Sequence, residues 1–326
     1  MKPVGALKLW SIALVLLGAS GCQERTPVPG TPRSRDEQTV RASESAGKKA
    51  VADAEADAPQ VAQAQPDPKH RRGDRVLFDR VSAFSHVRIV DQGNQRFLSF
   101  VRDPGQEVIE SAINLDAPDL LAVAYTRAMF VSYLLKPQQQ RCVIVGLGGG
   151  SMVRFLNRFF PEVQVDMVEI DPVVVQVAQD YFGVHAGPKA ALFVEDGFAF
   201  LAKAGPLYDS IYIDAFVKPA ADTDLEGMPL RLKTKQFLQG TQKRLTPGGV
   251  VVINLNDQPN LRTDIDLIRE SFPFFYLFPV PGTGNYIAVG STTAVSVGEM
   301  RANGHVVDLR GSHGFSFEAM SNFLVR

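Results

Sequence analysis

Residues 141–151 read Arg-Cys-Val-Ile-Val-Gly-Leu-Gly-Gly-Gly-Ser, and residues 165–171 read Val-Asp-Met-Val-Glu-Ile-Asp. The two apolar runs predict buried strands, joined by a glycine turn and by a helix that begins at Ser151. Glycines let the backbone of the turn lie against a ligand. A carboxylate about 20 residues later, at the tip of the next strand, can accept hydrogen bonds from ribose hydroxyls. We therefore expect an adenosine-containing ligand to contact Gly146, Gly148, Gly149, Gly150 and Glu169.

A glycine turn also occurs in sharp strand-to-helix connections that bind nothing, and this is the alternative interpretation. The acidic strand tip at nucleotide-binding spacing favours a nucleoside site over that alternative. Two further acids, Asp196 and Asp214, follow later apolar runs. Because the carboxyl ends of parallel strands share one edge of a sheet, these groups are expected to gather at the same crevice.

Beyond Pro137 apolar segments alternate with helical ones, which is typical of a doubly wound, Rossmann-like α/β sheet. Asp171 and Pro172 predict the start of a helix that Gly183 ends. Residues 274–278 and 285–289 are expected to form an antiparallel hairpin that completes a seven-stranded sheet of the methyltransferase type. Strand ends are expected near Val145, Glu169, Val194, Asp214 and Leu255.

Ahead of this sheet, short alternating segments from Arg75 to Val101 are separated by turn residues, which predicts a small antiparallel β subdomain. A helix is expected over Pro118 to Leu135, where apolar residues recur at helical spacing. The folded part is thus divided into three regions. They are a β subdomain with a helix (73–137), a Rossmann-like nucleoside-binding catalytic domain (138–292) and a C-terminal extension without a clear pattern (293–326).

The N-terminus has the pattern of an export signal, because Lys2 and Lys8 precede an apolar run that is too short to span a bilayer. Residues 19–22, Ala-Ser-Gly-Cys, resemble a bacterial lipoprotein signal, which predicts a signal peptide over 1–21 and lipidation of Cys22. The alternative is an ordinary secretory signal with an incidental cysteine. Residues 22–72 contain no Phe, Trp or Tyr and are expected to form a disordered linker.

This pattern predicts an exported lipoprotein held at a membrane by its N-terminal lipid. Gln23 favours the outer over the inner membrane, because the resemblance places an aspartate there in lipoproteins retained at the inner membrane. A cytoplasmic location is the alternative if the signal is misread.

The composition excludes several classes of protein. With 326 residues, 45% of them hydrophobic, and a net charge of -1, the chain is ordinary for a globular core and has no basic stripe for nucleic acid. The five histidines are scattered without ligand spacing, and Cys142 stands alone in a predicted core strand. We therefore expect no metal site and no disulfide. A G-x-S-x-G elbow, typical of serine hydrolases, is absent from the sequence.

Residues from about 75 to 291 resemble the spermidine synthase family, the aminopropyltransferases built on a methyltransferase-like Rossmann domain. The segments that carry this resemblance are Val143–Gly150, Val168–Asp171, Val194–Phe198, Tyr208–Asp214 and Leu245–Gly249. The resemblance implies that Glu169 holds the ribose of decarboxylated S-adenosylmethionine or its thioadenosine product, and that Asp196 and Gly197 contact the adenine. It also implies that Asp214 accepts a proton from an amine acceptor. An N-cap or surface role is the alternative for Asp214.

Several positions depart from the family pattern. The aspartate that the family usually carries in the glycine turn, where it holds the cofactor's ammonium, corresponds to Gly149. The family's Tyr-His-Glu becomes Tyr125-Thr126-Arg127, and the second acid of its Asp-x-x-Asp loop becomes Val217, followed by Lys218. Each change removes negative charge or adds positive charge where a diamine would bind. They argue against putrescine as the acceptor.

Three functions follow from these residues. The first is transfer of an aminopropyl group from decarboxylated S-adenosylmethionine to an amine or other small acceptor. The second is methyl transfer from S-adenosylmethionine in the same pocket, which the loss of the turn aspartate favours. The third is a non-catalytic, membrane-tethered binding protein, which would explain an export signal in a protein whose predicted cofactors are made in the cytoplasm. The sequence leaves open whether the chain forms a homo-oligomer.

Overall fold

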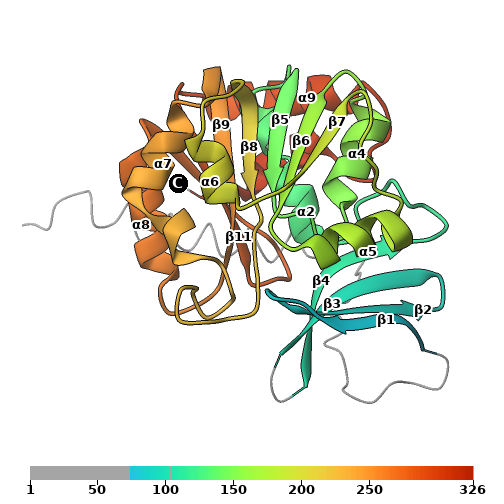
Figure 1. The fold of residues 1–326 in the computed structure, drawn as a ribbon. Coiled ribbons are helices and arrows are strands. Elements are labelled where there is room, and N and C mark those ends of the chain that lie inside the picture. Colours follow the sequence, from blue (N-terminus) through green and yellow to red (C-terminus); the bar gives the residue numbers. More distant parts are fainter. Residues whose placement is uncertain (1–73, 103–104, 326) are drawn as a thin grey trace, which may run out of the picture. The chain divides into compact units, whose positions relative to one another are not determined.

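The computed structural model describes residues 74–102 and 105–325, all within one compact unit, Gln63–Arg326 (Figure 1). The predicted signal peptide, the lipidation site Cys22 and the predicted linker lie outside the described residues. Among the helices that are described, none is both long and apolar enough to cross a bilayer.

The chain first forms a four-stranded antiparallel sheet in the order β1-β2-β3-β4. Its strands are β1 (Arg75–Val81), β2 (His86–Gln92), β3 (Gln95–Arg102) and β4 (Gln106–Asn114). The predicted antiparallel β unit is therefore confirmed, but the sequence pattern ended at Val101 and did not include β4. In the β3–β4 pairing, Leu98 lies opposite Ser111 and Ser99 opposite Ile109, so Glu110 is the extra residue of a β-bulge.

The single helix expected over Pro118 to Leu135 is wrong in its extent. The structure has two short helices instead, α2 (Ala124–Met129) and α3 (Ser132–Leu135). Arg127 donates from Nε and Nη2 to the carbonyl oxygens of Leu121 and Ala122, at 3.0 and 3.1 Å. These carbonyls precede the helix and are satisfied by the side chain of Arg127, and Val123, directly before α2, has an extended backbone.

A seven-stranded sheet follows, in the order β10-β11-β9-β8-β5-β6-β7. Its first five strands along the chain are parallel, and β11 pairs antiparallel with both β9 and β10. This confirms the doubly wound sheet and the C-terminal hairpin. The strands are β5 (Arg141–Val145), β6 (Gln164–Glu169), β7 (Ala190–Val194), β8 (Tyr208–Ile213), β9 (Leu245–Asn256), β10 (Phe274–Pro279) and β11 (Asn285–Ser291).

Helix α5 (Pro172–Phe182) begins and ends at the residues that the sequence predicted. Asp171 caps α5 by accepting the Val173 N–H at 2.9 Å, Pro172 occupies the first turn, and Gly183 ends the helix with φ +67°. Residues 293–326, which carried no clear pattern, contain α9 and α10, and both pack against α3. The helices after α3 are α4 (Ser151–Phe159), α5 (Pro172–Phe182), α6 (Gly197–Ala202), η1 (Leu230–Lys233), α7 (Lys235–Gln242), α8 (Leu261–Ser271), α9 (Val297–Asp308), α10 (Phe317–Met320) and η2 (Ser321–Phe323).

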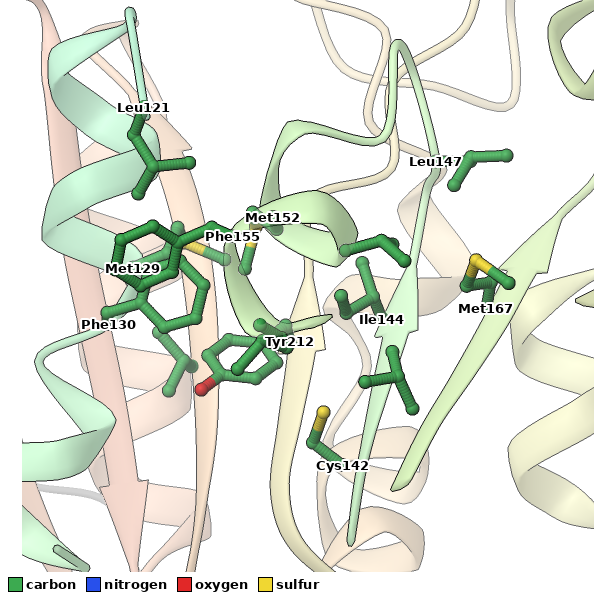
Figure 2. Packing of buried hydrophobic residues seen from close by; sticks show 14 of the residues in the cluster. Leu121, Met129, Phe130, Cys142, Ile144, Leu147, Met152, Phe155, Met167 and Tyr212 are labelled. Atoms are coloured by element: carbon green, nitrogen blue, oxygen red, sulfur yellow. The ribbon is translucent and has the colours of Figure 1, made fainter. Parts of the chain in front are cut away.

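Both faces of the large sheet are buried, because alternate residues of a strand point to opposite faces. Figure 2 shows one face, where Cys142 and Ile144 of β5 and Tyr212 of β8 lie near Phe130 of α2 and Phe155 of α4. The alternate residues of β5, Val143 and Val145, belong to a second apolar cluster on the opposite face. This double burial explains why the strands read as continuous apolar runs.

The strand order reverses at β5, which has β6 on one side and β8 on the other. Ligands of doubly wound sheets bind at such a switch point, outside the carboxyl ends of the strands. The glycine turn follows β5, Glu169 ends β6 and Asp214 follows β8. The topology therefore brings three of the sequence-predicted features to one place.

Candidate functional site

A cavity of about 320 Å³ lies at this switch point. The large sheet contributes the glycine turn, Glu169 and Asp214 to its lining, whereas β4 and α2 contribute Glu110 and Tyr125. The volume lies within the range of small-molecule sites. Residues more than 100 positions apart in the sequence, such as Glu110 and Asp214, thus line the same cavity.

The glycine turn is built so that its backbone presses against the end of β8. Gly146 has φ +92°, and a Cβ atom there would lie 2.0 Å from the carbonyl oxygen of Asp214. The Asp214 N–H donates to the Val145 carbonyl oxygen over 2.9 Å. Because neither the conformation nor the space admits a side chain at position 146, the turn can lie directly against Asp214 at the cavity.

Gly149 has a different role from the other turn glycines and does not line the cavity. Its N–H donates to the Ser111 Oγ over 2.9 Å, which ties the turn to β4. A Cβ atom at position 149 would lie 3.0 Å from both Phe182 and Ser111. An aspartate at position 149 would have to displace these neighbours. The packing of Ser111 against the turn therefore explains why a glycine stands where the family usually has an aspartate. Gly146, Gly148 and Gly150 do line the cavity.

Glu169 is almost fully buried and lines the cavity. Its two carboxylate oxygens accept the backbone N–H groups of Leu147, at 2.8 Å, and Asp171, at 2.9 Å. Burial raises the pKa of Glu169, and these two hydrogen bonds oppose the rise. A carboxylate has about four lone-pair sites, so the group is held in position and retains capacity to accept ribose hydroxyls.

Asp196 and Gly197 lie at the start of α6 and line the cavity together with Glu169. Asp196 caps this helix by accepting the Ala199 N–H at 2.8 Å, and its other oxygen pairs with Arg231 at 2.5 Å. Asp196 therefore has a structural role besides the predicted contact with adenine. Arg231 also lines the cavity, and the sequence analysis did not select it.

Asp214 follows β8 and lines the cavity. Its Oδ1 accepts the Asn254 side-chain N–H at 2.9 Å. Burial raises the pKa of Asp214 to about 6, while hydrogen bonds from Asn254 and Tyr125 oppose the rise. A carboxyl group with a pKa of this size can accept a proton near neutral pH, which is the property required of a general base.

Of the three residues of α2 that were predicted to bind the acceptor, two line the cavity and one does not. Tyr125 and Thr126 line the cavity, and the Tyr125 hydroxyl also lies 3.2 Å from the Glu110 carbonyl oxygen. Arg127 is not in the lining, because its guanidinium is directed to the two carbonyl groups ahead of α2. Lys218 does line the cavity. Of the two basic residues that were expected to repel a diamine, Lys218 lines the cavity and Arg127 does not.

Sequence reasoning missed Glu110, the bulged residue of β4, which lines the cavity. Burial raises the pKa of Glu110 to about 8, with contributions of the same sign from Asp214 and Glu226 and an opposing contribution from Arg102. Arg102 is itself bonded to Glu226, through the side chain at 3.1 Å and the backbone oxygen at 2.9 Å. The one sign of this residue in the sequence is a carboxylate that stands between Ile109 and Ser111 in an otherwise ordinary strand.

In the part of the chain that the structure describes, no group of three or more His, Cys, Asp or Glu residues is arranged to hold a metal ion. The buried Cys142 thiol lies in the apolar core, and burial raises its pKa well above the usual range. The side chains of the cavity can bind a small polar ligand through carboxylates and hydroxyl groups.

The family described as "Spermine/spermidine synthase domain" matches residues 123–270. The polyamine aminopropyltransferase of Vibrio vulnificus is 29% identical over 225 residues, which cover 68% of this chain and 73% of that protein. The human eEF1A lysine and N-terminal methyltransferase is 32% identical over 153 residues, which cover 44% of this chain and 22% of that protein.

A solved spermidine synthase in complex with the transition-state analogue AdoDATO has a TM-score of 0.61 and 18% identity, covering 76% of this chain and 85% of that one. At this identity the likeness concerns the fold, and it includes both the four-stranded and the seven-stranded sheets. The matched domain and the aminopropyltransferase relatives support the assignment of this chain to the spermidine synthase family, and those relatives are transferases.

Proposed function

We propose that this protein transfers an aminopropyl group from decarboxylated S-adenosylmethionine to an amine acceptor. The observation that carries the proposal is that Glu169, Asp214 and Tyr125 line one cavity. Glu169, Asp196 and Gly197 would bind the nucleoside, and Asp214 would take up the acceptor's proton. The aminopropyltransferase relatives support this assignment.

The reaction requires little beyond geometry. The nitrogen of the acceptor attacks the methylene carbon next to the sulfonium, the carbon–sulfur bond breaks, and its electron pair remains on sulfur as a neutral thioether leaves. The proton lost by the nitrogen passes to Asp214. Positioning the two reactants in one cavity supplies most of the acceleration, and the carboxylate adds general-base assistance.

Calorimetry with methylthioadenosine tests the nucleoside half of the proposal, with micromolar binding as the expected result. Turnover is tested with decarboxylated S-adenosylmethionine and a panel of small amines, followed by mass analysis of the products. Failure to bind methylthioadenosine, together with no effect of Glu169→Ala, would reject the nucleoside site. Amine turnover that Asp214→Asn abolishes would exclude a non-catalytic binding protein.

Methyl transfer from S-adenosylmethionine is the second candidate, and it is favoured by Gly149. In place of an aspartate, which would disfavour the carboxylate of S-adenosylmethionine, the turn has a glycine bonded to Ser111. The similarity to a methyltransferase supports this alternative. Incubation with each labelled cofactor decides between the two, because the mass added to the acceptor is either a methyl or an aminopropyl group.

We further propose that the protein is exported and carries a lipid on Cys22, with the outer membrane as its favoured location. Incorporation of a labelled fatty acid that is lost in Cys22→Ser would support this location, and a protein that retains its uncleaved N-terminus in the cytoplasm would contradict it. Export places the catalytic domain away from the compartment in which its cofactor is made, so turnover should be measured in both locations.

A further inference from the structure

His313 lies in the segment between α9 and α10 and is enclosed by phenylalanine rings. Only 2% of the residue is exposed. Its imidazole stacks on Phe160, with ring centroids 5.5 Å apart, and meets Phe159 and Phe317 edge-on at 5.2 and 5.1 Å. The ring of Phe155 lies 6.1 Å away. Three of these four rings come from α4 and its C-terminal end, so His313 packs the C-terminal helices onto α4.

The aromatic enclosure leaves polar atoms without partners. In the part of the chain that the structure describes, the buried Nδ1 of His313 and the buried hydroxyl of Tyr133 in α3 have no hydrogen-bond partner. Tyr133 packs on two of the same rings, Phe160 at 4.4 Å and Phe317 at 5.7 Å. Burying an unpartnered polar atom costs free energy, and burying an unpartnered charge costs far more. The enclosure therefore accepts a neutral imidazole and opposes an imidazolium.

The acid that acts on His313 is Asp308, the last residue of α9, and its oxygens already have partners. Oδ1 accepts the Phe317 N–H at 2.8 Å, and Oδ2 accepts the Glu318 N–H at 3.0 Å and the Ser316 hydroxyl at 2.7 Å. These bonds hold the first turn of α10. Burial lowers the pKa of His313, and the charge of Asp308 opposes this effect without reversing it.

Two cations border the enclosure. Arg310 lies over one of its phenylalanine rings, 5.9 Å from the centroid, and pairs with Glu162 at 3.4 Å. Arg158 of α4 lies over another ring at 5.7 Å and pairs with Asp119 at 3.9 Å. Besides burial, the charge of Arg310 lowers the pKa of His313. A proton on His313 would thus add a third positive charge to this part of the molecule.

We propose that His313 is a pH-sensitive lock on the C-terminal helices: the neutral imidazole holds α9 and α10 against α3 and α4, and its protonation favours their release. The inference goes beyond the proposed function, because it requires no ligand in the cavity. The segment that carries His313 joins two helices that both pack on α3, so its release exposes α3 and frees the unpartnered Tyr133 hydroxyl to bond to water.

The direction of the pH effect follows from the two states of the lock. A released His313 has the ordinary pKa of 6.5, and the enclosed ring has a lower one. Above pH 6.5 the imidazole is neutral in both states, and the lock is closed. As the pH falls below 6.5, the released state binds the proton more strongly, so the stability of the closed state is lost with falling pH.

Hydrogen exchange of the full-length protein at pH 7.5 and pH 5.5, followed by mass spectrometry, tests the lock. The rates are corrected for the intrinsic exchange rate at each pH. The opening constant of α9 and α10 should rise severalfold at the lower pH, with about tenfold as the limit set by one histidine with a pKa of 6.5 in the released state. At both pH values these helices should open more often than β5, since their release does not require global unfolding.

The matched variants are His313→Phe and His305→Gln. His313→Phe keeps an aromatic ring in the enclosure but cannot be protonated, so the opening of α9 and α10 should no longer depend on pH between 7.5 and 5.5. His305 belongs to the same extension but is exposed on α9, where it contacts Glu318. His305→Gln should therefore keep the pH dependence of the wild type.

An NMR titration of the wild type with labelled histidine gives a second readout that does not depend on the folding of a variant. Among the five imidazoles of the chain, one should stay neutral to a lower pH than the others. Five imidazoles that titrate together near pH 6.5 would overturn the lock. Exchange that keeps its pH dependence in His313→Phe, or α9 and α10 that open only together with β5, would overturn it as well.

Discussion

Two sets of residues that line the cavity are constructed in different ways. The residues proposed to bind the nucleoside, the nucleoside end, come from one continuous stretch, 146–197, and lie at or just after the ends of strands. The residues around the proposed proton acceptor, the acceptor end, combine Glu110 of β4 and Tyr125 of α2 with Asp214 after β8. The first end depends mainly on local backbone geometry, whereas the second depends on how distant elements pack. Changes at the acceptor end should therefore alter chemistry and specificity, and changes at the nucleoside end should alter cofactor affinity.

The largest expected effect on catalysis is at the acceptor end. Asp214→Asn should lower kcat on the order of 10²- to 10⁴-fold, because the amide cannot take up the proton of the acceptor nitrogen. Steady-state kinetics with the amine acceptor measures the loss. Methylthioadenosine affinity should stay within about twofold of the wild type, since Glu169 and the turn are unaltered. A variant with normal turnover would remove Asp214 from the chemistry.

The loop after β8 depends on a buried cation, Lys233, which bonds Asp224 at 2.5 Å and Asp264 at 2.6 Å. Lys233→Met should reduce the free energy of unfolding by about 3–5 kcal/mol, because it leaves two buried carboxylates without their cation. Urea denaturation at neutral pH measures this change. Lys243→Met, at an exposed position of the next helix end, is the control and should change the free energy by less than about 0.5 kcal/mol.

At the nucleoside end, Glu169→Gln should weaken methylthioadenosine binding by about 10- to 100-fold. The neutral side chain loses its charge-assisted bonds to the ribose, and it can replace only one of the two acceptors for the Leu147 and Asp171 N–H groups. Calorimetry measures the affinity. Glu195→Gln, at the residue directly after β7, is the control; Glu195 does not line the cavity, and this variant should bind methylthioadenosine normally. Normal binding by Glu169→Gln would separate this residue from the ribose.

The smallest effect comes from pH. Asp214 has a pKa of about 6 and acts in its ionised form, so kcat/KM for butylamine should fall about tenfold between its plateau above pH 7 and pH 5. A monoamine is chosen because it carries a single ionisable nitrogen. Stability should change in the opposite direction, since a raised carboxyl pKa favours the folded state at low pH and this contribution is lost as pH rises through 6. An activity profile that is flat from pH 5 to 8 would contradict the assignment.

Much of the nucleoside end could be predicted because its signals are local. Gly146 needs a positive φ and a close backbone approach, and Glu169 ends the strand that follows the turn and its helix. The switch from hairpin segments to alternating strands and helices likewise predicted the seven-stranded sheet. The assignment of Arg127 to the acceptor site rested on its place beside Tyr125, and the structure directs its guanidinium to carbonyl groups instead.

Local sequence patterns specify the doubly wound sheet, the glycine turn and the carboxylates at the strand tips, because hydrophobic periodicity and backbone conformation act over a few residues. Which acids share the cavity depends on tertiary packing. Glu110 reaches the cavity because β3 and β4 pair with a bulge, and its pKa depends on Asp214, Arg102 and Glu226 from distant segments. Strand register and the balance of charges in a buried space are properties of the packed chain, and no local pattern encodes them.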